Sequence, residues 1–161
     1  MAVLFEYADY LYKNGKTKKA LAIYWRMIDW YAASETITSR AIKSIHSIDE
    51  SNYSSEDKIK LANIELKIEK DPTKKREILF RIARTQENEI GKKEDAEATI
   101  LKILKIDGND KDALQALSRI YESDKRWNDL IEILKKLASI ESEPKVKRDI
   151  FIRISKLATH M

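Results

Sequence analysis

The sequence predicts an all-α fold made of antiparallel helix hairpins, and three observations support this prediction. The chain has 161 residues but only three Gly and two Pro, whereas average usage would give about nineteen in total. Apolar residues recur at helical spacing almost throughout. A ten-residue segment near the middle returns near the end. Scarce glycine excludes sandwiches, barrels and nucleotide-binding folds, which need it in turns or beside phosphates.

Four helices are predicted in the first part of the chain, at residues 2–14, 17–31, 35–48 and 55–70. Apolar residues at helical spacing indicate the first two: Leu4, Ala8 and Leu11, then Leu21, Tyr24 and Ile28. A long polar turn from Asp49 to Ser55 separates the third helix from the fourth. Ser54 and Asp57 have the spacing of a capping box, which marks the start of the fourth helix.

Five further helices are predicted at residues 72–90, 93–106, 110–124, 127–141 and 144–159. Pro72 and Pro144 suit the first position of a helix, where the missing N–H costs nothing. Residues 107–112 (DGNDKD) indicate a helix stop and restart. A calcium loop is excluded there because its glycine is second rather than sixth. Short connections make successive helices antiparallel neighbours.

The repeated segment sets the period of the array. Residues 75–84 (KREILFRIAR) return as residues 147–156 (KRDIFIRISK), an offset of 72 residues. Pro72 and Pro144 share this offset. Half of it, about 36 residues, is the length of one helix hairpin, and periods of this size indicate a solenoid of stacked helix pairs.

The units resemble the tetratricopeptide repeat, in which small residues let two helices approach and aromatic residues fill the remaining space. The first unit carries Leu4, Tyr7, Ala8, Leu11, Gly15, Ala20 and Tyr24. The third carries Leu79, Ile82, Ala83, Gly91, Ala96 and Ile100, with one extra residue before Gly91. The fourth carries Leu114, Leu117, Ser118, Tyr121, Trp127, Leu130 and Leu134, with Lys125 where the glycine would stand. The second keeps only Ala41 and Ala62 as small contacts.

This resemblance implies one domain, a right-handed superhelix over residues 1–161. Its units would be residues 1–34, 35–71, 72–109 and 110–143, with a half unit at 144–161. The implied function is a non-catalytic scaffold that binds a peptide or helix of a partner protein in a concave groove.

Alignment of the units with the repeat assigns each residue a position, which we call the repeat frame. In this frame Tyr7 and Tyr24 take core positions, whereas other residues face the groove. The groove side collects Phe5, Tyr12, Lys13, Phe80, Arg84, Arg119, Ile152 and Lys156. These residues form an amphipathic, mildly cationic surface. We therefore expect a partner segment with acidic and apolar residues.

An alternative function is RNA binding by the basic second half of the chain. Residues 1–71 hold 11 basic and 11 acidic residues, whereas residues 72–161 hold 20 and 16. Lys74, Lys75 and Arg76 begin one helix, where cations oppose the helix dipole. Lys145, Lys147 and Arg148 recur at the start of another. Both clusters are open to two interpretations, anion binding or solvated charge beside acidic neighbours.

No enzymatic, metal or cofactor site is predicted. The two histidines, His46 and His160, fall in different units, and the chain has no Cys, whereas a zinc site needs at least three protein ligands. Acidic pairs such as Glu56 and Asp57 lie in first helical turns, where carboxylates favour the dipole.

Both ends of the chain are more apolar than solvent-facing caps of a solenoid should be. We therefore expect that the chain is part of a longer array or self-associates through an apolar end. The first residues lack the pattern of a signal peptide, and no apolar run is long enough for a membrane span. A cytoplasmic protein is expected.

Overall fold

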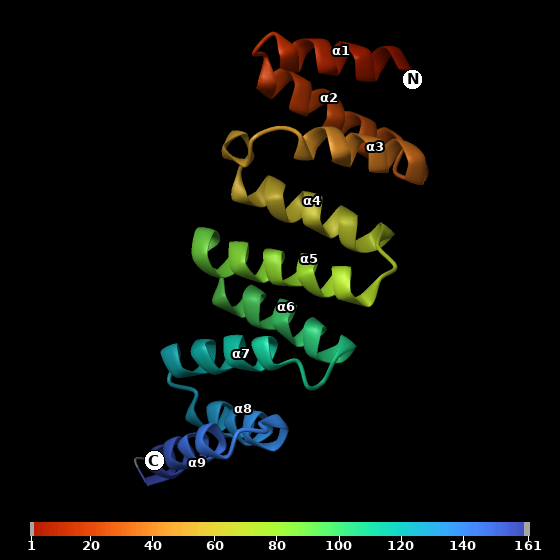
Figure 1. Cartoon of the computed structure of the whole chain (residues 1–161). Coiled ribbons are helices and arrows are strands. Elements are labelled where there is room, and N and C mark those ends of the chain that lie inside the picture. Colours follow the sequence, from red (N-terminus) through yellow and green to blue (C-terminus); the bar gives the residue numbers. More distant parts are fainter. Residues whose placement is uncertain (1, 160–161) are drawn as a thin grey trace. The chain divides into compact units, whose positions relative to one another are not determined.

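The computed structural model describes residues 2–159, and this part of the chain is all-helical with nine α-helices, as predicted (Figure 1). The chain divides into two compact units, residues 1–69 and 70–161. The first unit contains α1 (Ala2–Lys13), α2 (Thr17–Trp30), α3 (Glu35–His46), η1 (Glu50–Asn52) and α4 (Ser55–Ile68). The second contains α5 (Pro72–Thr85), η2 (Gln86–Ile90), α6 (Lys93–Ile106), α7 (Lys111–Ser123), α8 (Trp127–Ile140) and α9 (Pro144–Thr159).

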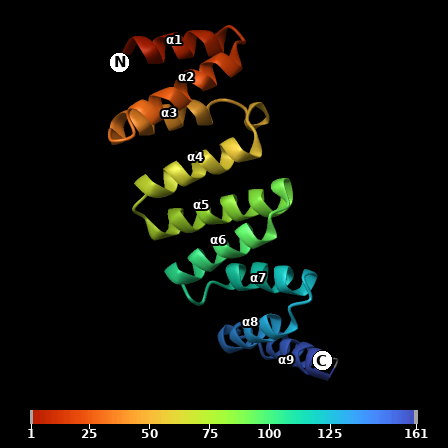
Figure 2. The same cartoon turned by 180° about the vertical axis from the view of Figure 1, so that it is seen from behind.

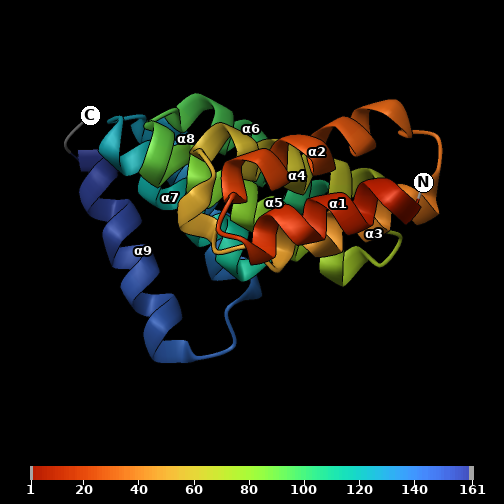
Figure 3. The same cartoon turned by 90° about the horizontal axis from the view of Figure 1, so that it is seen from above.

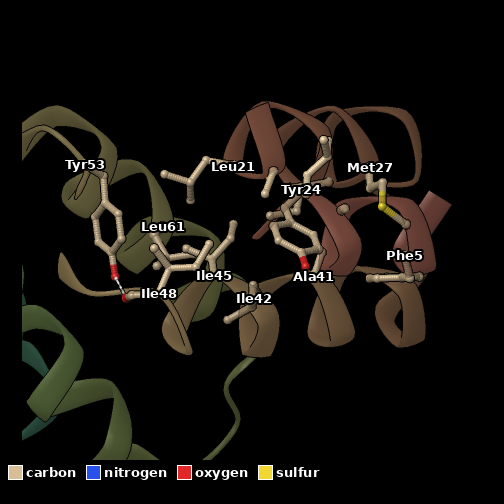
Figure 4. Packing of buried hydrophobic residues seen from close by; sticks show 14 residues of the cluster. Phe5, Leu21, Tyr24, Met27, Ala41, Ile42, Ile45, Ile48, Tyr53 and Leu61 are labelled. Carbon is tan, nitrogen blue, oxygen red and sulfur yellow. Dashed lines mark hydrogen bonds between the residues drawn. The ribbon is translucent and has the colours of Figure 1, made fainter. Parts of the chain in front are cut away.

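In the first unit, α1, α2 and α3 pack against one another in chain order. Figure 4 shows the core between them, in which Phe5, Tyr24 and Met27 are almost fully buried. Ala8 of α1, Ala20 of α2 and Ala41 of α3 are all 0% exposed. These alanines allow close helix contact because a larger side chain would not fit between well-packed helices.

The polar turn between α3 and α4 contributes a core residue. Tyr53 is buried in the cluster of the first unit, and its hydroxyl donates to the carbonyl of Ile48 at 3.2 Å (Figure 4). The capping box at the start of α4 is confirmed: the Asp57 N–H donates to Ser54 Oγ at 3.1 Å, and the Ser54 N–H donates to the Asp57 carboxylate at 3.3 Å. Local sequence signals therefore define this turn and the helix after it.

The tight turns inside the hairpins share one geometry. The Lys16 N–H donates to the Leu11 carbonyl at 2.9 Å, and the Arg126 N–H donates to the Tyr121 carbonyl at 2.8 Å. Each bond encloses a residue with positive φ, Gly15 at 71° and Lys125 at 57°. Lys125 thus occupies the glycine position of its turn, as the repeat frame predicts.

The third such turn contains one residue more. The Lys92 N–H donates to the Gln86 carbonyl at 2.8 Å, six positions back instead of five, and Gly91 has a φ of 76°. The chain between α5 and Gly91 forms the π-helical turn η2. A π turn is the usual way for a helix to hold one inserted residue. The extra residue recognised before Gly91 is therefore absorbed as η2, and the predicted helix 72–90 ends as an α-helix at Thr85.

In the second unit, α5 pairs with α6, α7 with α8, and α9 with α8 (Figure 2). Pro72 is the first residue of α5, and the Asp71 carboxylate caps that helix by accepting the Thr73 N–H at 2.8 Å. Residues 107–112 form the predicted stop and restart, with Asp110 capping α7. Among the described residues, no helix has the length and apolar character needed to cross a membrane.

Candidate functional site

The second unit contains a groove between α5, α7 and α9, with a volume of about 1160 Å³. Phe80 and Arg84 of α5 face it, one helical turn apart. Its remaining lining residues include Glu87 and Asn88 of η2, Gln115, Ala116, Arg119 and Glu122 of α7, and Val146, Ile150 and Arg153 of α9. Ile100 of α6 and Leu134 and Leu137 of α8 also line it. Side chains spaced three or four residues apart explain how each helix presents one stripe to the groove.

Several charged groups at the groove form pairs that join neighbouring elements. Lys111 Nζ lies 2.6 Å from Glu141 Oε2, and Arg153 Nη2 lies 2.8 Å from Glu122 Oε2. The hydrogen bond from Lys111, together with backbone N–H groups after α8, holds the pKa of the Glu141 carboxyl below its usual range. These cations are already occupied by acids of the protein itself.

Arg84 and Arg119 differ from the other cations of the groove. Both side chains are exposed, and neither makes a hydrogen bond or an ion pair within the described part of the chain. Both line the same groove, together with the half-buried ring of Phe80. This arrangement offers two free guanidinium groups and an apolar surface to one ligand.

Three sequence-predicted residues, Phe80, Arg84 and Arg119, therefore line the groove. Ile152 and Lys156 are exposed on α9 but are not among the lining residues. The groove stripe of α9 consists instead of Val146, Ile150 and Arg153. The two helices contain the repeated segment, which is identical at five of ten positions, but α9 presents a different part of its surface than α5 does.

The expected mild positive charge is not a property of this lining as a whole. Five basic and five acidic residues line the groove. The acidic residues that sequence reasoning missed are Glu87, Asp112, Glu122, Glu141 and Glu143. The last two lie in the connection between α8 and α9, where the repeat frame gives no groove positions.

The predicted residues of the first unit have separate environments. Phe5 is only 2% exposed: its ring packs near Tyr24, at 6.4 Å between ring centroids, and lies 4.1 Å below the guanidinium carbon of Arg40. The expectation that Phe5 lines an open groove is therefore corrected. Tyr7, expected in the core, is instead 53% exposed. The first helix is rotated about its axis relative to the repeat frame, which exchanges the two aromatic residues.

Tyr12 and Lys13 lie at the end of α1. Tyr12 is half-buried against the core of the first unit, and its hydroxyl donates to the Ser47 carbonyl at 3.1 Å. Lys13 is exposed. A role of these two residues in partner binding stays a prediction.

Among the described residues, no group of three or more His, Cys, Asp or Glu side chains is arranged to hold a metal ion. His46 pairs through Nε2 with Glu65, so that it joins α3 to α4. His160 lies outside the described residues.

No protein-family model matches the sequence, and comparison with the curated proteins finds no similar chain. The groove is therefore interpreted from its own geometry and chemistry.

Proposed function

We propose that this protein is a non-catalytic interaction module of the tetratricopeptide type that binds a segment of a partner protein in the groove of its second unit. The observation that carries the proposal is the pair of free arginines beside an apolar surface. Arg84 and Arg119 are exposed and unpaired within the described residues, although the groove contains acids that neutralise its other cations.

The groove chemistry defines the ligand. A guanidinium group binds a carboxylate through two parallel hydrogen bonds, which makes an Asp or Glu side chain, or a terminal carboxylate, the natural partner of Arg84 and Arg119. Phe80, Val146 and Ile150 offer apolar contacts in the same groove. The volume of about 1160 Å³ exceeds the roughly 300–1000 Å³ of ordinary small-molecule pockets. It suits several residues of a peptide.

The test begins with short random peptides selected on the immobilised full chain. We expect the selected peptides to combine acidic with apolar residues. The double substitution Arg84→Glu and Arg119→Glu should then weaken their binding at least about tenfold, a typical loss when charged partners are removed at an interface. Fluorescence anisotropy measures the affinity, and thermal unfolding establishes that the variant is still folded.

A matched control carries the same charge change outside the groove. Lys102→Glu with Lys105→Glu alters two exposed residues of α6 that do not line it. The control should bind the selected peptides as the unmodified chain does. Equal affinity for the groove variant and the unmodified chain would refute the proposed binding surface.

RNA binding by the second half stays the alternative prediction. We rank it second because several basic residues of this half are paired with acids: Arg76, Lys93, Lys111, Arg126 and Arg153. Of the two basic clusters at helix starts, only Arg76 is among these residues. A gel-shift titration with RNA at two salt concentrations separates the two functions, since RNA binding weakens steeply with salt.

A further inference from the structure

Helix α9 contains the segment that resembles α5 but leaves uncovered the surface that α5 buries. In α5, which pairs with α6, Leu79, Ile82 and Ala83 are each 3% exposed. Their counterparts, 72 residues later, are Phe151, Ile154 and Ser155. Phe151 is 51% exposed and Ser155 is also exposed, whereas Ile154 is half-buried.

Helix α7 provides a second comparison within the same unit. Its residues Leu114, Leu117 and Ser118 occupy the same repeat positions and are between 0% and 5% exposed in the pair with α8. Ser118 and Ser155 are thus the same residue type at the same position, one buried and one exposed. At this position the difference in burial therefore lies in the neighbouring helix and not in the residue type.

The other side of α9 is covered. Helix α9 packs on α8, and its residues Ile150, Ile154 and Leu157 are half-buried. Figure 3 shows α9 at the edge of the second unit. We call the uncovered surface, formed by Phe151, Ser155 and Ala158 with the edge of Ile154, the open face of α9.

The helices that cover such faces elsewhere in the chain share one pattern. Buried residues stand at positions i, i+4 and i+7 in three helices: Ala20, Tyr24 and Met27 in α2, Ala96, Ile100 and Ile103 in α6, and Leu130, Leu134 and Leu137 in α8. This spacing places all three side chains on one stripe of a helix. An occupant of the open face needs the same stripe.

A free cation beside the open face adds a charge requirement. In α5, Arg76 donates from Nη2 to Asp110 Oδ1 at 3.1 Å and to Asp112 Oδ2 at 2.6 Å, two acids that follow α6 in the chain. The counterpart of Arg76 in α9 is Arg148. Arg148 is exposed and makes no hydrogen bond or ion pair within the described residues. It lacks the carboxylates that occupy Arg76.

We propose that the open face of α9 binds an amphipathic helix of a different protein. That helix has apolar residues at i, i+4 and i+7, and a carboxylate about 14 residues after the first of them pairs with Arg148. Residues 92–112 of this chain carry this pattern, from Ala96 to Asp110. A synthetic peptide of that sequence is therefore the probe.

The peptide is labelled and titrated with the full chain. We expect saturable binding by fluorescence anisotropy and a gain of helical circular dichroism in the mixture. Phe151→Asp should weaken binding at least about tenfold, as expected for a central apolar contact. Ile152→Asp is the matched control, because Ile152 is adjacent, is 47% exposed and lies off the open face. It should leave the affinity unchanged.

Two further variants test the charge requirement and the choice of surface. Arg148→Glu should weaken binding, and a peptide with Asp110→Lys should restore affinity for that variant. The groove substitutions Arg84→Glu and Arg119→Glu should have no effect on this peptide, so that failure here is separate from failure of the proposed groove function.

Three outcomes would overturn the proposal. One is no binding of the peptide to the folded chain, and another is binding that Phe151→Asp leaves intact, as when the peptide exchanges with α6 of the chain. The third comes from sedimentation equilibrium of the chain alone. A dimer that Phe151→Asp dissociates would show that a second copy occupies the face, which is the predicted self-association through an apolar end.

Discussion

The turn between α7 and α8 contains a lysine in a conformation that favours glycine, and this predicts a stabilising substitution. Lys125 has a φ of 57°. Its side chain is exposed and makes no hydrogen bond or ion pair within the described residues. Its main-chain bonds are a donation from its N–H to Glu122 at 3.2 Å and an acceptance from Trp127 at 3.0 Å, and both survive replacement by glycine.

The expected magnitude follows from the two opposing backbone terms. The left-handed conformation costs a non-glycine residue about 1–2 kcal/mol. Glycine in turn loses more freedom on folding, by roughly 0.5–1 kcal/mol. Lys125→Gly should therefore raise the free energy of unfolding by about 0.5–1 kcal/mol. This corresponds to a rise of several degrees in the melting temperature of a unit of this size, at about 4–8 °C per kcal/mol.

Urea unfolding followed by circular dichroism measures the change, and two variants control it. Lys125→Ala removes the same side chain but keeps a Cβ, so it should give no gain. Gly91→Ala makes the reverse change in a turn with φ of 76°, where an added Cβ meets nothing within 4 Å. It should destabilise by about 1 kcal/mol through backbone strain alone. Equal stability of the Gly and Ala variants at position 125 would refute the reasoning.

Three further predictions concern the second unit. Burial would raise the pKa of Asp110, but hydrogen bonds from Arg76 and the Ala113 N–H hold it below its usual range; the stabilisation is present above the ordinary Asp pKa and is lost as pH falls. Asp110→Ala should cost about 2–4 kcal/mol at neutral pH, and less in acid urea titrations. Burial and the hydrogen bond to Glu97 raise the pKa of Tyr121 to about 12, and burial also raises the pKa of Tyr24. Tyr121→Phe should therefore reduce the late phase of the alkaline tyrosinate absorbance titration, and an unchanged amplitude of that phase would contradict this environment. Deletion of Asn88 should convert η2 into the shorter turn seen elsewhere in the chain and leave a cooperative urea transition, whereas loss of that transition would show that the π turn is required for folding.

The helices were predictable because their ends carry local signals. Pro72 fixes the start of α5, and the Ser54 and Asp57 capping box fixes the start of α4. The glycine positions located the tight turns, including the one where Lys125 stands in for glycine. Such signals act within a few residues, so they are legible in a single sequence.

The rotation of α1 was not predictable, because it depends on contacts distant in the sequence. The repeat frame exposes Phe5 and buries Tyr7, whereas the structure does the opposite. The ring of Phe5 is covered by Arg40, which belongs to α3. The assignment of repeat positions considers only the pair α1 and α2, so it does not include the contact with α3.

The two free arginines of the groove were likewise not predictable from the sequence, because ion pairing depends on contacts between elements. Among the basic residues that line it are Arg84, Lys111, Arg119 and Arg153, and the amino-acid composition does not distinguish them from one another. Lys111 and Arg153 are not available to a ligand, because they form ion pairs with Glu141 and Glu122, which belong to other elements. What makes a cation available to a ligand is therefore the lack of an acid on the neighbouring helix, a property of pairs of elements. The same reasoning distinguishes Arg76 from Arg148, which occupies the equivalent position of the repeat. Arg76 forms ion pairs with two acids of its own unit, whereas Arg148 forms no ion pair within the described residues. The ion pairs of Arg76 thus indicate which group a partner must supply to Arg148, namely a carboxylate.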